Sequence, residues 1–139
     1  IFGSAGIFFF GWLCDRIRDA KYSAALGFLL MAVGMFLLFR TTNVIMLYGF
    51  AMFYGFGYGS LAPVTPYLIS DRFGRQVLGA TYGLLTFFAT GIGGALGPII
   101  GGFIFDKTGS YKSGWIMNAV FLLIISLLIL ALKPNPKEG

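Results

Sequence analysis

Long apolar runs separated by short charged segments dominate this sequence of 139 residues. Charged residues are absent from the runs at 1–14, 22–39, 41–70, 76–105 and 113–132. About 20 apolar residues are enough for a helix to cross the ~30 Å hydrocarbon core of a bilayer, and 1–14 is too short to cross alone. The pattern therefore predicts four full spans, at 22–39, 44–69, 76–105 and 114–132. It also indicates that 1–14 is the end of a truncated span.

The overall composition points to the same class of protein. Hydrophobic residues make up 58% of the chain and charged residues 11%, and the mean hydropathy is +0.85. A soluble domain of this size cannot bury so much apolar surface. We therefore expect an all-α, polytopic membrane helix bundle that is surrounded by the lipid bilayer, as a multi-pass protein of the cell or inner membrane.

The distribution of charge predicts the orientation of this bundle. The formal net charge is +5, but the cations stand at the ends of the apolar runs and not on one polar face, so no nucleic-acid partner is expected. If the loops alternate, one side carries Arg16, Arg18, Lys21, Arg72, Arg75, Lys133 and Lys137, and the other carries Arg40, Lys107 and Lys112. Because cytoplasmic loops carry an excess of Lys and Arg, the first side is predicted to be cytoplasmic. The C-terminus and the polar tail at 133–139 would lie on that side.

Small residues on 76–105 predict how this span packs and bends. Gly93, Gly97 and Gly101 recur every fourth residue, so they form one stripe on which a neighbouring backbone could approach closely. Pro98 cannot donate a hydrogen bond to the carbonyl of Gly94, and its ring crowds that carbonyl. We therefore expect a kink in this helix and take it as the element around which the others are organised.

Two of the predicted spans carry rows of polar side chains. The rows consist of Tyr54 and Tyr58 on 44–69, with Ser60 following them, and of Tyr82, Thr86 and Thr90 on 76–105. The six residues are the candidates for lining a cavity. Residues three or four apart share one face of a helix, and such a face is better suited to a water-lined cavity than to lipid. Packing against a neighbouring helix is the competing interpretation, and it explains the same rows.

The span at 44–69 is also irregular. Pro63 and Pro66 interrupt its hydrogen bonds near the cytoplasmic end, and Gly55 and Gly59 form a small-residue stripe. An irregular helix at membrane depth persists only where protein or water satisfies the freed carbonyls, so we expect this span beside a cavity. By contrast, 22–39 has one packing face and is otherwise predicted to face lipid, as is the aliphatic span at 114–132.

Residue types that carry acid–base, nucleophilic or metal chemistry are scarce. The chain has no histidine and a single cysteine, Cys14, which excludes an internal disulfide. No Asp or Glu lies inside an apolar run. Enzymatic function, a metal site and a bound cofactor are therefore not expected.

Two motifs suggest a family. Residues 11–16 read G-W-L-C-D-R, which resembles the G-x-L-x-D-R signature in the cytoplasmic loops of the major facilitator superfamily of transporters. Residues 97–101 read G-P-I-I-G and 106–111 read D-K-T-G-S-Y. This pair is similar to the eleventh helix and following loop of the monocarboxylate-porter and oxalate/formate-antiporter branches.

The resemblance implies a carrier of twelve helices in two six-helix halves that rock about a central site. This chain would be part of the C-terminal half: 1–14 the end of helix eight, then helices nine (22–39), ten (44–69), eleven (76–105) and twelve (114–132). Its partners would be the N-terminal half and a small-molecule substrate. The implied function is secondary transport of a small organic solute, with a monocarboxylate-like anion as one class, by alternating access. The alternative is a small four-helix membrane scaffold or accessory subunit.

The acidic residue of the first motif suggests a gate at the cytoplasmic rim on physical grounds. A carboxylate at Asp15 could meet the positive N-terminus of the helix that begins near Gln76, with Arg75 close by. We expect this contact to form when the cytoplasmic side is closed. The other residues assigned to the gating motif are Gly11, Arg16, Asp71 and Arg72. In the competing interpretation these charges merely end helices at the water interface.

The chain departs from the family pattern in two places. Carboxylate-transporting relatives carry an arginine four residues before the motif glycine, where this chain has Ile7. An anion in a low-dielectric cavity needs a compensating cation, so either the cation lies in the other half or the substrate is not a simple carboxylate. In the loop, Arg18, Asp19 and Ala20 stand where the signature has glycine and two basic residues.

Overall fold

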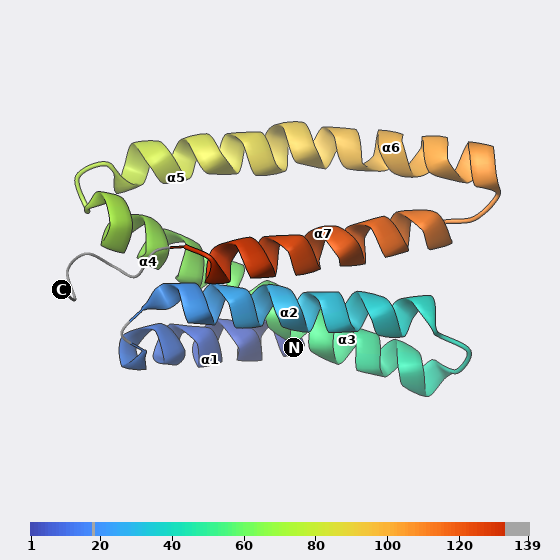
Figure 1. Ribbon diagram of the computed structural model, residues 1–139, viewed down its shortest axis with the longest axis horizontal. Coiled ribbons are helices and arrows are strands. Elements are labelled where there is room, and N and C mark those ends of the chain that lie inside the picture. Colours follow the sequence, from blue (N-terminus) through green and yellow to red (C-terminus); the bar gives the residue numbers. More distant parts are fainter. Residues whose placement is uncertain (18, 133–139) are drawn as a thin grey trace.

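The computed structural model describes residues 1–17 and 19–132, and within these ranges every regular element is a helix. The elements are α1 (Phe2–Arg16), α2 (Ala20–Phe39), α3 (Val44–Gly59), α4 (Leu61–Phe73), α5 (Leu78–Thr86), the π-helix η1 (Phe87–Ile92), α6 (Gly93–Thr108) and α7 (Lys112–Leu130). Figure 1 shows most of them running lengthwise along the molecule, with α4 inclined to the others. The all-α prediction is confirmed. Arg18 and the predicted tail at 133–139 lie outside the described residues.

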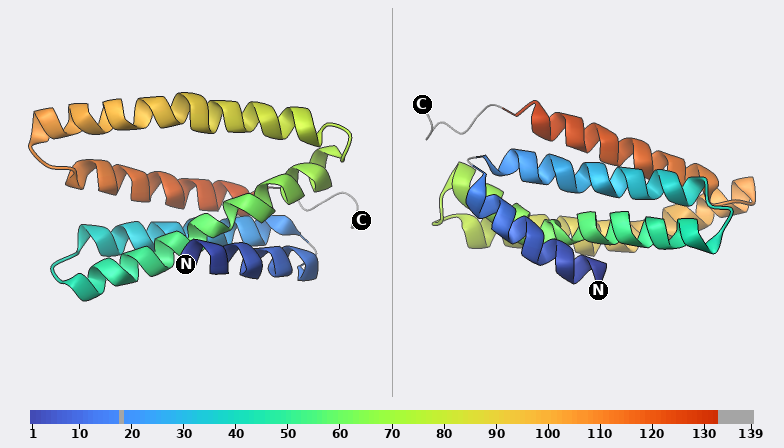
Figure 2. Two further views of the ribbon diagram at one scale, coloured as in Figure 1. Left: turned by 180° about the vertical axis from the view of Figure 1, so that it is seen from behind. Right: turned by 90° about the horizontal axis from the view of Figure 1, so that it is seen from below.

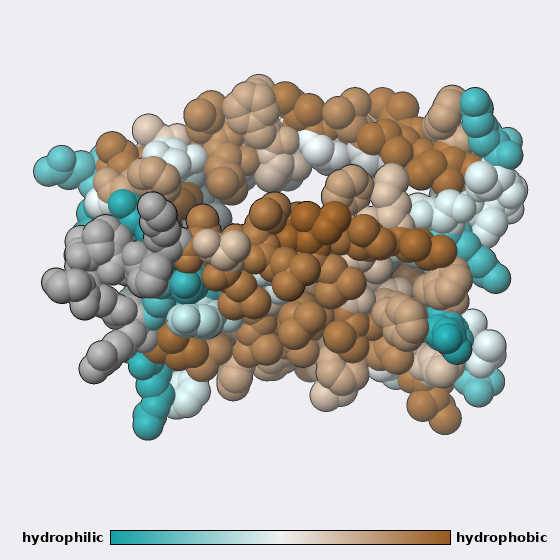
Figure 3. Space-filling model, viewed as in Figure 1, coloured by the Kyte–Doolittle hydropathy of each residue, from teal (hydrophilic) through white to brown (hydrophobic). Residues whose placement is uncertain are grey.

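Four helical stretches are long and apolar enough to cross a membrane. They are Ala20–Phe39, Val44–Phe73, Leu78–Thr108 and Lys112–Leu130. The face drawn in Figure 3 is mainly apolar along its middle, and hydrophilic side chains gather at its two ends. This arrangement fits a polytopic bundle in a lipid bilayer. The described rim with Arg16, Lys21, Arg72 and Arg75, where α1, α4 and α7 end, is called the basic rim below.

Helix α2 is the centre of the packing. It lies between α7 and the layer formed by α1 and α3 (Figure 2). Buried residues make up 44% of the apolar window in Ala20–Phe39, against 0% in Leu78–Thr108. The prediction that 22–39 mainly faces lipid is therefore wrong. The error arises because nearly all residues of this span are apolar or small, so hydropathy does not distinguish a face on lipid from a face on another helix.

Glycines bring the backbones of α1, α2 and α3 together. A methyl group at Gly6 would clash with the carbonyl of Phe56, and one at Gly59 would clash with the carbonyl of Gly3. One at Gly34 would lie 2.8 Å from the backbone nitrogen of Tyr54. Since such distances leave no room for a side chain, these contacts depend on glycine. Gly55 also faces α1, where a methyl group on it would lie 3.4 Å from Cβ of Phe2.

The stripe of Gly93, Gly97 and Gly101 lies differently. Within the described chain, a methyl group at Gly97 or Gly101 would meet nothing within 4 Å, and one at Gly93 would meet only the carbonyl of Phe88 on the same helix. The predicted packing of this stripe against another helix is therefore not found among the described residues. Spacing shows which glycines share a face, but it does not say which helix that face meets.

The irregular turns lie near the predicted prolines but not at each of them. In Val44–Phe73 the interruption falls at Ser60, between α3 and α4, directly after Gly59, whose carbonyl is the one that Pro63 leaves without an N–H partner. The predicted interruption at Pro66 is not found, since α4 continues through it. In Leu78–Thr108 the interruption is η1, where the N–H of Gly93 reaches the carbonyl of Phe88, while α6 continues through Pro98. A π-helical turn of this kind inserts one residue into an α-helix.

Candidate functional site

A pocket of about 570 Å³ lies between α1, the α3–α4 junction and α5 with η1. Its position near the middle of Val44–Phe73 places it away from both polar ends of the bundle. A volume of this order suits a small organic molecule. The lining residues are Gly3, Ser4 and Ile7 from α1, Tyr58, Gly59, Leu61, Ala62 and Thr65 from α3 and α4, and Tyr82, Leu85, Thr86, Ala89 and Thr90 from α5 and η1.

The wall formed by α5 and η1 supplies two hydroxyl-bearing threonines one turn apart. Thr86 donates its hydroxyl to the carbonyl of Tyr82 at 2.8 Å, so its oxygen keeps lone pairs that can accept a hydrogen bond. The facing wall supplies Tyr58, whose side chain is 59% exposed and stacks on Tyr54 with ring centroids 6.5 Å apart. The pocket thus offers aromatic surface and hydroxyl groups to a bound molecule.

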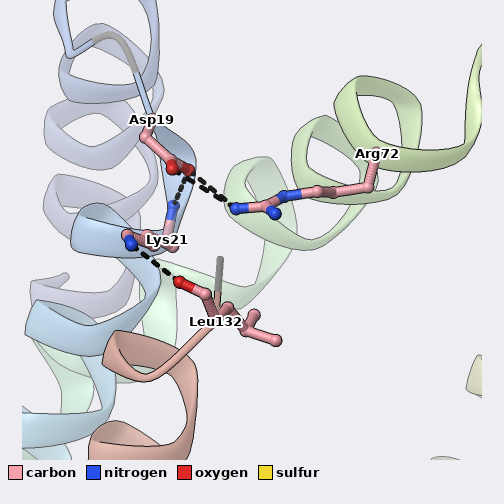
Figure 4. Close-up of polar contacts among 4 residues, drawn as sticks. All are labelled: Asp19, Lys21, Arg72 and Leu132. Atoms are coloured by element: carbon pink, nitrogen blue, oxygen red, sulfur yellow. Dashed lines mark hydrogen bonds and ion pairs between the residues drawn. The ribbon is translucent and has the colours of Figure 1, made fainter. Parts of the chain in front are cut away.

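A second feature is a cluster of polar contacts at the basic rim (Figure 4). Asp19 caps the start of α2, where its Oδ1 accepts from the backbone N–H of Lys21 at 3.1 Å. Arg72, at the end of α4, donates from Nη2 to Oδ1 and Oδ2 of Asp19 at 3.2 and 3.3 Å. Lys21 donates from Nζ to the carbonyl of Leu132 at 2.8 Å. The cluster joins α2 to the ends of α4 and α7.

The environment of this cluster leaves the ion pair only weakly screened by water. The side chains of Asp19 and Arg72 are 5% and 17% exposed, so water screens their attraction only in part. Asp19 also lies at the positive N-terminus of α2, and Lys21 lies at the negative C-terminus of α7. Charge, capping and helix dipoles therefore favour the same arrangement.

Comparison with known proteins decides the family. The model of the Major Facilitator Superfamily matches residues 1–139. This chain belongs to the major facilitator superfamily. The sequence-based resemblance is thereby confirmed, since the match covers the whole chain.

Individual relatives of this major facilitator chain are named as transporters. It is 31% identical to monocarboxylate transporter 12-B of Danio rerio, over 86% of this chain and 26% of the relative. It is 29% identical to the riboflavin transporter RibZ of Clostridioides difficile, over 96% of this chain and 28% of the relative. It is 27% identical to the proton-coupled antiporter flippase LtaA of Staphylococcus saprophyticus, over 73% of this chain and 25% of the relative. The chain thus spans about a quarter of the length of these curated relatives. No solved structure matches it.

The predicted cavity residues divide into two groups. Four of the six line the 570 Å³ pocket: Tyr58, Tyr82, Thr86 and Thr90. The other two, Tyr54 and Ser60, turn toward α2, where Ser60 is 2% exposed beside Gly27 and Tyr54 lies on Gly34. In this structure both residues take part in helix packing, as in the competing interpretation.

The predicted gating residues all lie near the basic rim. Among the described residues, the exposed Asp15 makes no hydrogen bond or ion pair, and α5 begins at Leu78 without a side-chain cap from its N-cap residue. The expected contact of Asp15 is therefore not formed in this structure, and Asp19 provides the carboxylate that pairs with Arg72. Arg16 lies over the ring of Trp12, with 5.4 Å from Cζ to the ring centroid.

Three further gating residues surround a second pocket or lie next to it. Asp71 and Arg75 line this pocket of about 530 Å³ at the basic rim, together with Pro63, Pro66 and Tyr67. Gly11 lies beside it, since a methyl group on Gly11 would be 3.9 Å from Cβ of Pro63. The two prolines of α4 thus shape the rim more than the central pocket.

Sequence reasoning missed Asp19 and the wall contributed by α1. Asp19 directly precedes an apolar run, a position that favours an N-cap, so its capping role could have been found. Its pairing with Arg72 joins residues 53 apart in the chain and follows only from the packing of α4 on α2. Ser4 and Ile7 line the pocket because glycines let α1 approach α3, which no local pattern reveals.

Proposed function

We propose that this chain forms part of a longer secondary transporter that moves a small organic solute across the membrane by alternating access. The observation that carries the proposal is the 570 Å³ pocket near the middle of the spans, in a chain of the major facilitator superfamily. Membership alone supports transport, and the pocket supplies a place for the solute. The relatives' greater length supports an N-terminal half as the partner that completes the site.

The packing supports a rigid part and a mobile part of this chain during transport. Helices α1 to α4 and α7 hold together through glycine contacts, the Asp19–Arg72 ion pair and the bond from Lys21 to α7. The hairpin of α5, η1 and α6 has few contacts with them, and Figure 3 shows the molecule hollowed between this hairpin and α7. We propose that the hairpin moves relative to the rest, opening and closing the pocket.

Orientation and gating follow from the charges. The basic rim is proposed to face the cytoplasm, with the C-terminus on the same side. Asp15, Arg16, Asp71 and Arg75 would then stand where the carrier opens inward. We propose that Asp15 engages the start of α5 in a conformation closed at this rim, and that Asp19 and Arg72 brace α4 throughout.

Uptake into proteoliposomes tests the proposal. The full-length carrier would be reconstituted and offered labelled monocarboxylates, riboflavin and other neutral solutes, with liposomes lacking protein as the background. We expect saturable uptake of at least one solute. Ala89→Trp, which fills the pocket, should abolish it, whereas Ile99→Trp on the exposed surface of α6 should not. Lack of uptake by correctly inserted protein for every solute would favour the scaffold or accessory subunit.

A further inference from the structure

The central pocket is lined without any charged side chain. Its described lining consists of aliphatic and aromatic groups, glycines and the hydroxyls of serine, threonine and tyrosine. The charged residues gather at the two ends of the bundle, as the hydrophilic patches in Figure 3 show. This wall therefore offers no opposite charge to an ion bound against it.

The absence of a counter-charge on this wall bears on what can bind there. An ionised carboxylate or amine that leaves water for a low-dielectric pocket loses its hydration, and hydroxyl groups compensate only a part of that loss. A neutral hydroxyl, carbonyl or amide group needs only a hydrogen-bond partner. The wall thus discriminates against a charged group and accepts a neutral polar one.

The geometry also indicates the shape of the solute. Tyr58 is stacked on Tyr54 with an interplanar angle of 15°, and most of its side chain is exposed. Flat aromatic surface pairs well with another planar group. On the facing wall, the hydroxyl of Thr86 donates its hydrogen to the backbone carbonyl of Tyr82, so its oxygen remains free to accept a hydrogen bond from the solute. A planar body with a hydrogen-bond donor, such as an amide N–H or a hydroxyl, fits both walls.

We infer that the solute presents an uncharged face to this chain: a planar or aliphatic body carrying hydroxyl, carbonyl or amide groups, and not a carboxylate. The inference rests on the proposed function, because the solute occupies the same pocket. It narrows the substrate class from organic solutes in general to those that are neutral at this wall. To bind a carboxylate here, a cationic side chain from another part of the carrier would have to extend across the pocket to this wall.

Protection of a cysteine in the pocket tests the inference. Thr90→Cys, in the full-length carrier with other reactive thiols replaced, would be labelled with a water-soluble maleimide in the presence of benzamide or benzoate. The two probes share a ring and differ in charge. We expect benzamide to slow labelling at concentrations about tenfold lower than benzoate does. Lys112→Cys, at the opposite rim from the basic one, serves as the control and should be protected by neither probe.

A pair of matched variants then tests the physical cause. Leu85 lines the pocket from α5 and is 46% exposed, so Leu85→Arg brings a cation to the wall and Leu85→Gln brings a neutral side chain of similar reach. We expect the arginine to improve protection by benzoate about tenfold and the glutamine to leave it unchanged.

Contrary results are distinct for the two proposals. Equal or stronger protection by benzoate in the protein with native Leu85 would overturn the inference, as would protection by neither probe. Neither result bears on whether the protein transports a solute, because the uptake measurement does not use these probes. Loss of saturable uptake for solutes of every charge would instead overturn the proposed function.

Discussion

Glycine-rich helices in this protein occur in two different settings. In α1 and α3, glycines lie where one backbone touches another, and a methyl group at Gly59 would clash with the carbonyl of Gly3. In α6, a methyl group at Gly97 or Gly101, which have the same four-residue spacing, would meet nothing within 4 Å among the described residues. Close glycine spacing thus permits an approach of two backbones but does not produce one. Substitutions in the two settings should therefore differ in their cost to stability.

The largest contrast is expected between a glycine of the packed region and one of the hairpin. Gly59→Leu forces a side chain against the backbone of α1, where a methyl group would already lie 2.9 Å from the nitrogen of Ile7. Overpacking of this kind should cost about 3 kcal/mol or more. Gly97→Leu adds a side chain where the described chain leaves room. The melting temperature of the full-length protein in detergent measures the change in stability for both variants.

The outcome for Gly97 sharpens the comparison. If Gly97→Leu is tolerated while Gly59→Leu is not, the α6 stripe faces lipid or a loosely packed neighbour. An equal loss of stability in the two variants would contradict the contrast and would show that a helix outside this chain covers the stripe. The melting temperature of Gly59→Ala, which adds a smaller side chain, should fall between those of Gly59→Leu and the unaltered protein.

Breaking the ion pair at the basic rim should cause the next largest loss of stability. Asp19→Asn keeps an oxygen that can cap α2 but removes the charge that faces Arg72. Breaking a fully buried pair costs about 3–5 kcal/mol, and since Arg72 is 17% exposed we expect about 2 kcal/mol. Thermal unfolding measures this loss. Asp106→Asn, an exposed aspartate of the opposite rim, is the control and should leave stability unchanged.

The same two regions show what could be predicted from sequence. The spans follow from the charge-free runs, because length and hydropathy alone determine whether a segment can cross a bilayer. The central place of α2 could not be predicted, since its Ala24, Ala25 and Gly27 are as apolar as a lipid-facing residue. The i, i+4 spacing of Tyr82, Thr86 and Thr90 correctly places these three residues on one face, and they line the pocket. The positions of Tyr54 and Ser60 could not be predicted, because the face of α3 that meets α2 is determined by tertiary packing.

Removing the hydrogen bond between α2 and α7 should reduce stability less than breaking the ion pair does. Lys21→Met keeps most of the aliphatic stem and removes the bond from Nζ to the carbonyl of Leu132. One charged hydrogen bond at a helix C-terminus contributes about 1 kcal/mol here. We expect faster amide hydrogen exchange at the end of α7, with little change in α5 and α6. Lys112→Met is the matched control, and equal exchange in both variants would mean that Lys21 does not hold α7.

Asp15→Asn should have the smallest effect on stability and yet change function. Asp15 is exposed and makes no ion pair in the described chain, so its neutralisation should alter stability by less than about 0.5 kcal/mol. If Asp15 engages the positive start of α5 only when the basic rim is closed, its loss destabilises that closed state alone. Cysteines placed in the pocket should then react faster with a reagent added from the basic rim. Unchanged reactivity, beside a clear loss of stability in Asp19→Asn, would mean that Asp15 merely ends α1 at the water interface and that the rim is braced by Asp19 without a gate at Asp15.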